Sequence, residues 1–285
     1  MERYQILFFD LDGTLLDAQH RLPVENKTAI LEMRRQGALI GIASGRPLYM
    51  MASFIRDLDV TVPVITNNGA LVQDAASAKV LCIHRLPSDV LADTLNFLTK
   101  KNYDISAFCV NHTYLPENSP RVKRYALYNE QAVAKGYPCM HYEYLDAKKS
   151  LEQIVTELVS AGCVRISVNP HSGSGFERLR TLVKRMPHVF AVPSAPDSFD
   201  LMAQGVSKWE AIRFVCKYLS IPEKAICTFG NDPNDTEMLQ NASLSFAMAN
   251  ASLEAKAAAK YITNATNNYC GVAEALYRYV SGHIL

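Results

Sequence analysis

The chain has 285 residues, of which 49% are hydrophobic and 20% are charged, and its formal net charge is +1. This length supports one large domain or two smaller ones, and the nearly neutral charge argues against nucleic acid or an acidic membrane as a partner. No apolar run approaches the ~20 residues of a membrane helix, and the N-terminal residues lack the long apolar stretch of a signal peptide. The 7 scattered cysteines contain no Cys-x-x-Cys pair, which favours free thiols, so we expect a cytoplasmic protein.

The N-terminal segment predicts strands that alternate with helices. A buried strand is expected at 4–9 ("YQILFF"), a helix at 25–37 and a second strand at 38–44. Another helix opens at Pro47, and 62–72 form a strand that runs into an Asn-Gly turn. Because the strands are apolar throughout and joined by helices, they predict a parallel sheet with both faces covered.

The middle of the chain has a different composition, richer in Tyr, Pro, Asn and His. Helical periodicity covers 90–102 and 150–162, and strands are expected at 163–169 and 198–203. These elements predict a second α/β unit that is inserted into the first one. A basic stretch within it, 178–186, has helical spacing and is interpreted as a solvated helix face, not as a nucleic-acid site.

The alternation of helices and strands returns after the insert. A helix is expected at 206–219, where Ser207 and Glu210 form a capping box that places Lys208 in the first turn. A strand, a helix and a strand follow at 224–230, 233–242 and 244–249. We therefore predict a core domain made of 1–82 and 204–285 and an inserted domain made of 83–203.

Four polar segments follow strands or open a helix of the predicted core. They are Asp10-Leu11-Asp12-Gly13-Thr14, Ser44-Gly45-Arg46, Lys208 and Gly230-Asn231-Asp232-Pro233-Asn234-Asp235. Because active sites of open parallel sheets lie beyond the carboxyl ends of the strands, we expect these segments to meet. Their carboxylates, hydroxyls and single ammonium suit a divalent cation and a phosphate, and oxygen ligands favour Mg²⁺.

Two carboxylates that flank a single leucine are costly unless a cation lies between them. At ~4 Å and an effective dielectric near 20, each charge pair gains about 4 kcal/mol. With the cation bound, Asp10 can attack phosphorus and carry it as an aspartyl-phosphate, and Asp12 can protonate the leaving alcohol and later activate water. Gly13 permits a tight turn whose backbone N–H groups face the phosphate.

The four segments, in this order, resemble the haloacid dehalogenase superfamily. The motifs that carry the resemblance are Asp-x-Asp-Gly-Thr-Leu, Ser-Gly-Arg, Gly-Val-Ser-Lys and Gly-x-x-x-Asn-Asp-x-x-Met-Leu. The "ITNNGALV" turn and the long insert are similar to its Cof-type phosphatase branch. The resemblance implies a Rossmann-like parallel-sheet core with an inserted α/β cap, Mg²⁺ as cofactor, and hydrolysis of phosphate monoesters.

The same resemblance implies roles for individual residues. Asp10 is the nucleophile, and Asp12 is the general acid/base and binds the metal through its backbone carbonyl. Lys208 neutralises the transferring phosphoryl group. The remaining residues expected to bind phosphate or substrate are Thr14, Ser44, Gly45, Arg46, Asn68 and Asn234. Two of them have a second interpretation from the residues alone: Arg46 can pair with a structural carboxylate, and Asn68 can simply shape its loop.

One position departs from the family pattern. The family usually has Asp directly after the glycine of the fourth motif, and this chain has Asn231 there. Either Asn231 or the following Asp232 can complete the metal site. We favour Asn231, with Asp235 as a ligand or an anchor behind the ligands, because Asp232 followed by Pro233 is typical of a helix N-cap.

Together these features predict a Mg²⁺-dependent phosphatase for small phosphorylated metabolites. Sugar phosphates are the first expectation, and the resemblance also allows pyridoxal phosphate or flavin mononucleotide. Two alternatives stay open: a phosphotransferase such as a sugar phosphomutase, and a non-catalytic sensor of a phosphorylated ligand with a weakened metal site. The inserted domain is expected to set specificity, and the sequence predicts no oligomeric state.

Overall fold

The structure is a computed structural model that describes residues 4–100, 103–134, 136–137, 139–169, 181, 189–195 and 198–284. The chain divides into two compact units. The core unit comprises Met1–Leu81 and Ser207–Leu285, and the inserted unit comprises Cys82–Val206. These bounds differ from the expected ones by one residue at the first boundary and by three at the second. Of the basic stretch 178–186, only Thr181 is among the described residues.

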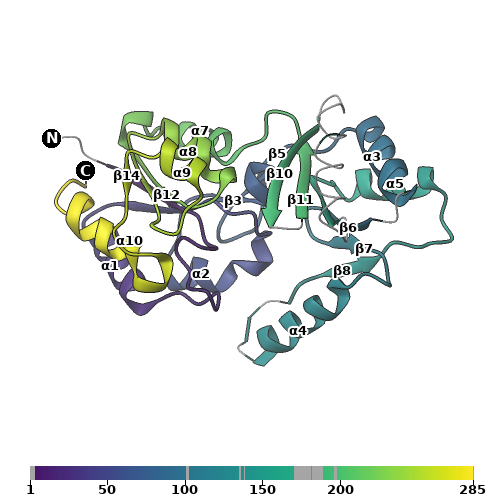
Figure 1. The fold of residues 1–285 in the computed structure, drawn as a ribbon, viewed down its shortest axis with the longest axis horizontal. Coiled ribbons are helices and arrows are strands. Elements are labelled where there is room, and N and C mark those ends of the chain that lie inside the picture. Colours follow the sequence, from purple (N-terminus) through teal and green to yellow (C-terminus); the bar gives the residue numbers. More distant parts are fainter. Residues whose placement is uncertain are drawn as a thin grey trace. The chain divides into compact units, whose positions relative to one another are not determined.

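A parallel sheet of five strands forms the centre of the core unit, in the order β14-β13-β12-β1-β2 (Figure 1). The strands are β1 (Ile6–Phe9), β2 (Leu39–Ile42), β12 (Ile226–Gly230), β13 (Leu244–Ala247) and β14 (Tyr261–Ile262). All neighbouring strands are parallel, as the apolar segments predict. β2 lies on one side of β1, while β12, β13 and β14 extend on the other side. The connection after β1 therefore leads to a strand on one side, and the connection after β12 leads to a strand on the other side. Open α/β sheets bind ligands at the point where the strand order reverses in this way.

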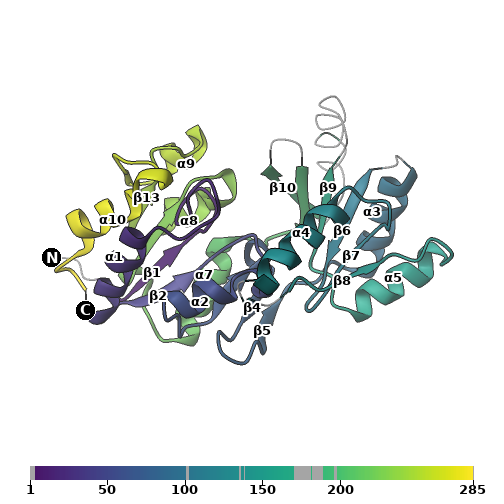
Figure 2. The ribbon, with the colours of Figure 1, turned by 90° about the horizontal axis from the view of Figure 1, so that it is seen from below.

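Helices pack on this sheet. They are α1 (Val24–Arg35), α2 (Ala52–Asp57), α7 (Lys208–Tyr218), α8 (Thr236–Asn241), α9 (Leu253–Ala258) and α10 (Gly271–Ala275). α1 contacts α10, and Figures 1 and 2 show these two helices side by side. α8 contacts both α7 and α9. None of the helices in the described part of the chain is long and apolar enough to cross a membrane.

Stacked phenylalanines fix the central strands against one another. The parallel register sets Phe9 beside Phe229 and Phe229 beside Phe246. The ring centroids of these neighbours are 4.9 Å and 4.8 Å apart, and all three side chains are fully buried. Phe9 and Phe229 each lie within one residue of a strand's carboxyl end. Packing of these rings therefore holds in place the strand ends from which the polar segments emerge.

The expected strand at 62–72 is two short strands with a turn between them. β3 (Val64–Thr66) and β4 (Leu71–Gln73) pair antiparallel around a turn at Asn67–Gly69, and β5 (Val80–Ile83) completes this sheet. An Asn-Gly pair tolerates positive φ, and Asn67, Asn68 and Gly69 all adopt it. The Asn-Gly turn thus lies where it was expected, and the residues after it form a second, antiparallel strand. Similarly, the expected helix at 233–242 begins as a 3₁₀ turn over Pro233–Asp235.

A six-stranded sheet forms the inserted unit, in the order β10-β11-β9-β6-β7-β8. Its elements are α3 (Ser88–Lys100), β6 (Asp104–Phe108), β7 (Thr113–Leu115), α4 (Arg121–Ala134), β8 (Tyr142–Tyr144), α5 (Leu151–Ser160), β9 (Arg165–Asn169), β10 (Val189–Ala195) and β11 (Ser198–Ala203). Apolar side chains of the sheet, among them Ile105, Ile166 and Leu201, pack on α3 and α5 and form this unit's core. Four of these elements correspond to the helices and strands expected at 90–102, 150–162, 163–169 and 198–203.

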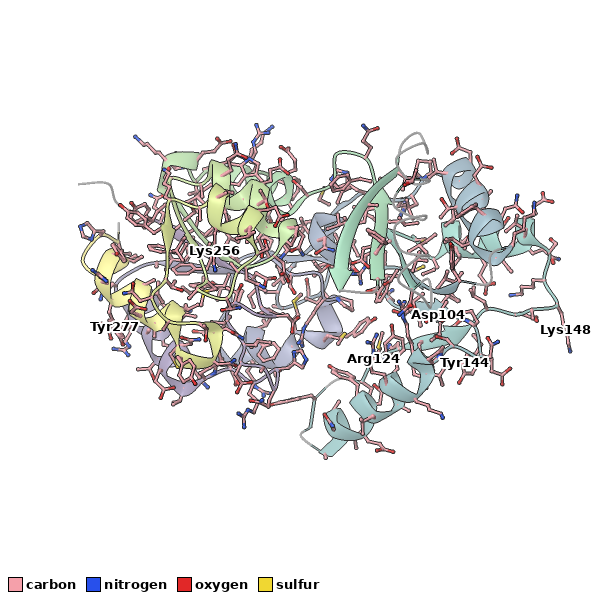
Figure 3. The ribbon with its side chains drawn as sticks, in the orientation of Figure 1. Asp104, Arg124, Tyr144, Lys148, Lys256 and Tyr277 are labelled. Atoms are coloured by element: carbon pink, nitrogen blue, oxygen red, sulfur yellow. The ribbon has the colours of Figure 1, made fainter. Side chains whose placement is uncertain are left out.

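The opposite face of this sheet is polar. The strand register places Ser106 beside Ser167, and Ser167 beside Asp200, across three neighbouring strands. Asp104, labelled in Figure 3, belongs to the same alternating set on β6. Asp104 pairs with Arg121 at 3.3 Å, and Asp200 pairs with Arg165 at 2.6 Å. All four of these charged side chains are at least nine-tenths buried.

Candidate active site

The first motif begins where β1 ends. The backbone N–H of Asp10 donates to the carbonyl of Phe229 at 3.0 Å, so the pairing of β1 with β12 continues to the nucleophile position. The fourth motif begins at Gly230, the last residue of β12. Neighbouring parallel strands end at the same edge of the sheet, and the two motifs consequently face one another across the β1–β12 pair.

Lys208 joins these two motifs from a helix. Ser207 caps α7 by accepting the N–H of Glu210 at 3.1 Å, which makes Lys208 the first helical residue. Its Nζ donates to Asp10 Oδ1 and to Asp235 Oδ1, both at 2.6 Å. The three side chains are exposed by 1%, 8% and 0% for Lys208, Asp10 and Asp235. Two carboxylates therefore share one ammonium group in an environment with almost no water.

The protonation of this cluster follows from its burial and its charge balance. Burial raises the pKa of Asp10 to about 7, and the nearby Asp235 carboxylate adds to the rise while Lys208 opposes it. Burial by itself would lower the pKa of Lys208, but the two carboxylates more than compensate and raise it. Lys208 thus keeps its charge, whereas the ionised form of Asp10 is disfavoured.

Asp235 uses both of its carboxylate oxygens inside the protein. Oδ1 accepts from Lys208, and Oδ2 accepts the backbone N–H groups of Asn231 at 2.8 Å and Asp232 at 3.1 Å. Asp232 is the N-cap residue of the 3₁₀ turn that Pro233 opens. In this arrangement Asp235 holds the loop and orients Lys208, which is the anchoring geometry; its role as a direct metal ligand stays a prediction.

Asn231 lies against the first motif. Its Oδ1 accepts the hydroxyl of Thr14 at 2.8 Å, and both side chains are at least nine-tenths buried. Gly13 has φ +77, and a Cβ on it would lie 2.5 Å from Asn231 Nδ2. A side chain at position 13 would therefore be strained and would push Asn231 away. The Gly-Thr pair of the first motif is thus required for contact between the two loops.

The second motif is tied to the Asn-Gly turn. The hydroxyl of Ser44 accepts the N–H of Arg46 at 3.2 Å, and the carbonyl of Ser44 accepts the N–H of Asn68 at 3.0 Å. Asn68 Oδ1 accepts from Asn234 Nδ2 at 3.0 Å, which connects this turn to the fourth motif. A Cβ on Gly45 would lie 2.8 Å from Asn68 Oδ1, so the glycine permits this close approach.

The Asn-Gly turn also contacts the helix that carries Lys208. Gly69 has φ +98, and a Cβ there would lie 2.1 Å from the carbonyl oxygen of Ser207. Only glycine fits between the turn and the N-terminus of α7. The core unit thereby brings together every residue that the sequence assigned to the site, from the first motif to Asp235.

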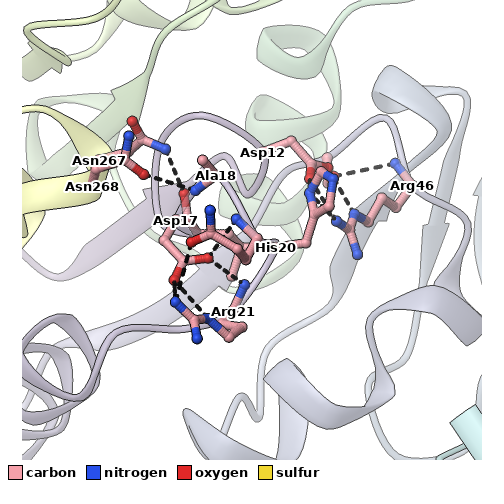
Figure 4. A network of polar contacts seen from close by, with 11 residues as sticks. Asp12, Asp17, Ala18, His20, Arg21, Arg46, Asn267 and Asn268 are labelled. Atoms are coloured by element: carbon pink, nitrogen blue, oxygen red, sulfur yellow. Dashed lines mark hydrogen bonds and ion pairs between the residues drawn. The ribbon is translucent and has the colours of Figure 1, made fainter. Parts of the chain in front are cut away.

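Asp12 points to a different set of partners (Figure 4). Arg46 donates from Nε to Oδ2 at 2.7 Å and from Nη2 to Oδ1 at 2.5 Å, and His20 Nδ1 lies 2.8 Å from Oδ1. Burial opposes ionisation of Asp12, yet the hydrogen bonds from Arg46 and His20 hold its pKa well below the ordinary value. The hydrogen bond to Asp12 in turn raises the pKa of His20. Of the two interpretations of Arg46, the structure shows the pairing with a carboxylate, and that carboxylate belongs to the site.

The family model for haloacid dehalogenase-like hydrolases matches residues 7–276 of the chain. The protein belongs to this family. Phosphatase YwpJ of Bacillus subtilis (strain 168) is 26% identical to the chain, with 94% of the chain and 97% of the relative covered. The 5-amino-6-(5-phospho-D-ribitylamino)uracil phosphatase YbjI of Escherichia coli (strain K12) is 27% identical, with 95% and 94% covered.

Solved structures agree with the fold. A haloacid dehalogenase-like hydrolase from Bacteroides thetaiotaomicron has a TM-score of 0.79 at 20% identity, with 97% of this chain and 99% of that chain covered. The prediction of the haloacid dehalogenase superfamily and of its Cof-type phosphatase branch is confirmed, and so are the predictions of a hydrolase and of a Rossmann-like α/β fold.

Haloacid dehalogenase-like phosphatases generally use a metal ion, and the oxygen atoms at the sheet edge suit one. Asp10 offers a carboxylate, Asp12 a backbone carbonyl and Asn231 an amide oxygen. No group of three or more His, Cys, Asp or Glu side chains suited to a metal is found among the described residues. Mg²⁺ does not need one, since it binds through one or two carboxylates together with phosphate oxygens and water. The donor set therefore fits a hard cation that the substrate helps to hold.

Sequence reasoning missed several residues that shape the site. His20 contacts Asp12, and Asn250 donates from Nδ2 to the carbonyl of Gly13 at 2.8 Å while its Oδ1 accepts the N–H of Asn267. Neither His20 nor Asn250 falls inside a recognisable motif. No local sequence signal identifies either contact, because both depend on how a loop folds.

Proposed function

We propose that the protein is a Mg²⁺-dependent phosphatase that hydrolyses phosphate monoesters of small metabolites through a phosphorylated Asp10. The observation that carries the proposal is the buried cluster in which Asp10 and Asp235 share Lys208 at 2.6 Å. Among the described residues, Asp10 forms its hydrogen bonds through Oδ1, so Oδ2 is the oxygen available to attack phosphorus. Lys208 stays charged and faces the position where negative charge accumulates during transfer.

The remaining residues supply the other parts of a two-step displacement. In the first step Asp10 Oδ2 forms a bond to phosphorus and the bond to the leaving oxygen breaks. Asp12, which is ionised in the free protein, has to take up a proton when the substrate binds, and it donates this proton to the leaving oxygen. In the second step Asp12 takes a proton from water, which attacks phosphorus and releases inorganic phosphate from Asp10. Thr14 and Ser44 hold the phosphoryl oxygens, together with the loop that contains Asn68 and Asn234.

Mg²⁺ would be held by Asp10, the carbonyl of Asp12 and Asn231, and when bound it neutralises charge between the nucleophile and the phosphate dianion. Asp232 fits this role less well, because it is exposed and caps the 3₁₀ turn. In the inserted unit, which we propose to be the specificity domain, the sheet face opposite α3 and α5 carries serine hydroxyls and buried ion pairs.

Sugar phosphates are the substrate class that we favour, ahead of pyridoxal phosphate and flavin mononucleotide. The name of the Escherichia coli relative describes a substrate in which a phosphorylated ribityl chain, an open-chain sugar alcohol, is joined to a uracil ring. A polar binding face suits hydroxyl-rich groups better than flat heterocycles, which need aromatic stacking. We expect the enzyme to act on such metabolites in the cytoplasm.

The proposal is tested by replacing the nucleophile. Asp10→Asn keeps the shape of the side chain, and it should lower kcat by at least ~10³, because phosphate monoesters hydrolyse very slowly unaided. Phosphate release from a panel of phosphorylated metabolites and from p-nitrophenyl phosphate measures this. Asp59→Asn, the same change at an exposed position of the core unit, is the control and should keep wild-type activity.

The products separate the two alternatives. Acid quenching during turnover should trap phosphate on the peptide that contains Asp10. An isomerised sugar phosphate without free phosphate would indicate a phosphotransferase, and binding without any turnover at saturating Mg²⁺ would indicate a sensor. Near-normal turnover by Asp10→Asn would overturn the proposed role of Asp10 altogether.

A further inference from the structure

The loop that follows the first motif is folded around one aspartate (Figure 4). Asp17 Oδ1 accepts the backbone N–H groups of Gln19 and Arg21, both at 2.9 Å, and Oδ2 accepts from Arg21 Nε at 2.9 Å. The N–H of Asp17 donates back to the carbonyl of Arg21, and Ala18 is tied to Asn268 at 2.8 Å. A short loop with this many internal hydrogen bonds holds a defined shape even though most of it is exposed.

This shape places His20 against Asp12. His20 has φ +56, a left-handed conformation that non-glycine residues adopt rarely. In this conformation its Nδ1 lies 2.8 Å from Asp12 Oδ1. The His20 side chain is 68% exposed, so burial against neighbouring side chains does not force its contact with Asp12. An imidazole that carries its proton on Nδ1 donates this hydrogen bond whether the ring is neutral or charged.

Three donors now surround one carboxylate. Arg46 takes one lone-pair position on each oxygen of Asp12, and His20 takes a second position on Oδ1. A carboxylate has about four lone-pair positions, so one position on Oδ2 is left for exchange of a proton. With Arg46 alone, the two oxygens would be equivalent and the carboxylate would be held from one side only. The contact with His20 makes the two oxygens of Asp12 inequivalent, because Oδ1 then accepts two hydrogen bonds and Oδ2 accepts one.

We propose that His20 is a positioning residue, which fixes the carboxylate of Asp12 so that Oδ2 faces the oxygen atoms between which the proton moves. The inference rests on the proposed role of Asp12 as general acid and base. It predicts that loss of the His20 donor impairs the proton transfer to the leaving group more than it impairs phosphate binding. It also predicts that Asp17 acts on the reaction only through His20.

Two variants at position 20 separate the donor from the backbone. Glycine and asparagine both tolerate positive φ, but only His20→Asn retains a donor near the position of Nδ1. The readout is kcat/KM for an alkyl phosphate, whose leaving group needs a proton, against p-nitrophenyl phosphate, whose leaving group needs little help. General acid catalysis contributes roughly 10²- to 10⁴-fold, and we expect His20→Gly to lose about tenfold on the alkyl phosphate and less than about twofold on p-nitrophenyl phosphate. His20→Asn should recover most of that loss.

Two controls complete the experiment. Gln19→Gly alters the neighbouring residue of the same loop, whose side chain contacts Arg21, and should leave both substrates unaffected. Asp17→Ala should resemble His20→Gly, and the double variant should be no worse than either single one, because both changes act on one contact.

The outcomes distinguish this inference from the proposed function. An equal loss on both substrates by His20→Gly, or no loss on either, would overturn the positioning role. Additive losses in the Asp17→Ala and His20→Gly double variant would do the same. Activity of Asp10→Asn, or absence of phosphate release by the wild type, would instead contradict the proposed function, and these two measurements do not depend on position 20.

Discussion

The core unit and the inserted unit both bury aspartates with basic partners, but in different proportions. In the core unit, Asp10 and Asp235 share the single ammonium of Lys208. In the inserted unit, Asp104 and Asp200 each pair with an arginine of their own. The guanidinium of Arg165 also lies over the ring of Phe108, 3.8 Å from its centroid. Burial of charge is common to both places, and the charge balance is what differs.

That difference separates a reactive cluster from a structural one. In the described part of the inserted unit each of these two aspartates is matched by an arginine, and a buried pair that is neutral overall has little charge to offer a cation or a proton. In the core cluster, burial first of all and then the nearby Asp235 carboxylate make ionisation of Asp10 costly and raise its pKa to about 7. A bound cation would lower the cost of ionising Asp10, so the geometry of the site favours metal binding.

The largest effects on stability and turnover should come from removing the basic partner of the buried aspartates in each unit. Lys208→Met leaves two buried carboxylates without a cation, which should destabilise the core by about 3 kcal/mol and lower kcat at least ~10²-fold. Arg165→Met should destabilise the inserted unit by a similar amount, because it removes the buried ion pair with Asp200, but should leave kcat on p-nitrophenyl phosphate within about twofold of wild type. Urea unfolding and a phosphatase assay on the folded proteins measure the two effects.

Lys208→Gln supplies a second test if the methionine variant does not fold, because glutamine can still donate hydrogen bonds to the carboxylates. It should fold and yet turn over slowly. The contrast between the two units would fail if Arg165→Met lowered turnover as much as either Lys208 variant does.

A smaller effect is expected from restoring a charge in the fourth motif. Asn231→Asp adds a carboxylate where the family usually has one, and we expect Mg²⁺ to bind the metal-free protein about tenfold more tightly. The direct attraction at ~4 Å is about 4 kcal/mol at an effective dielectric of 20, and dehydration of the new carboxylate offsets most of it. Titration calorimetry measures the affinity without any turnover.

Asn241→Asp is the matched control for this variant, since the same change at the exposed last residue of α8 should leave Mg²⁺ binding as it is. Unchanged affinity in Asn231→Asp would remove Asn231 from the set of ligands. If Asp232→Asn then weakened binding instead, the ligand would be Asp232.

The sequence predicted the core strands and the four motifs because each rests on local chemistry. An apolar run such as Ile6–Phe9 predicts a buried strand by itself. Because the carboxyl ends of parallel strands lie at one edge of the sheet, Asp10 and the loop after Gly230 were expected to lie close together. The N-cap expected at Ser207 likewise predicted where Lys208 lies in its helix, although the Glu210 side chain pairs with Arg213 in place of completing the expected capping box. Motif order and sheet topology thus sufficed to bring the main site residues together.

Contacts that depend on exact loop conformation were beyond sequence reasoning. The Asn-Gly turn expected within 62–72 is present, but apolar periodicity does not report that Leu71–Gln73 pairs back on Val64–Thr66 as the second strand of a hairpin. His20 reaches Asp12 only because Asp17 folds the intervening loop by hydrogen bonds to its backbone. Such side-chain-to-backbone bonds have several possible partners in sequence, and the structure decides which of them form.

The smallest effect concerns the pH dependence of stability, and it tests whether the excess carboxylate of the core is costly when metal is absent. The pKa of Asp10 is about 7 in the folded protein against an ordinary value of 3.8, so the folded state binds the extra proton between these values. Its contribution to stability is complete below about pH 4 and is lost as the pH rises through about 7. Asp10→Asn has no such loss.

In EDTA, the difference in melting temperature between Asp10→Asn and the wild type should therefore grow in favour of the variant as the pH rises from 5 to 8. We expect a change of a few degrees, since 1 kcal/mol shifts the melting temperature of a protein of this size by roughly 2–4 °C. The chain's 1 tryptophan, Trp209, follows Lys208 in α7 and is 5% exposed, so its fluorescence reports unfolding of the core unit.

Added Mg²⁺ should stabilise the wild type more at pH 8 than at pH 5, because the cation competes with a proton for Asp10. A difference in melting temperature that stays constant across this range would mean that Lys208 fully compensates the buried carboxylate, and the contrast with the balanced pairs of the inserted unit would disappear.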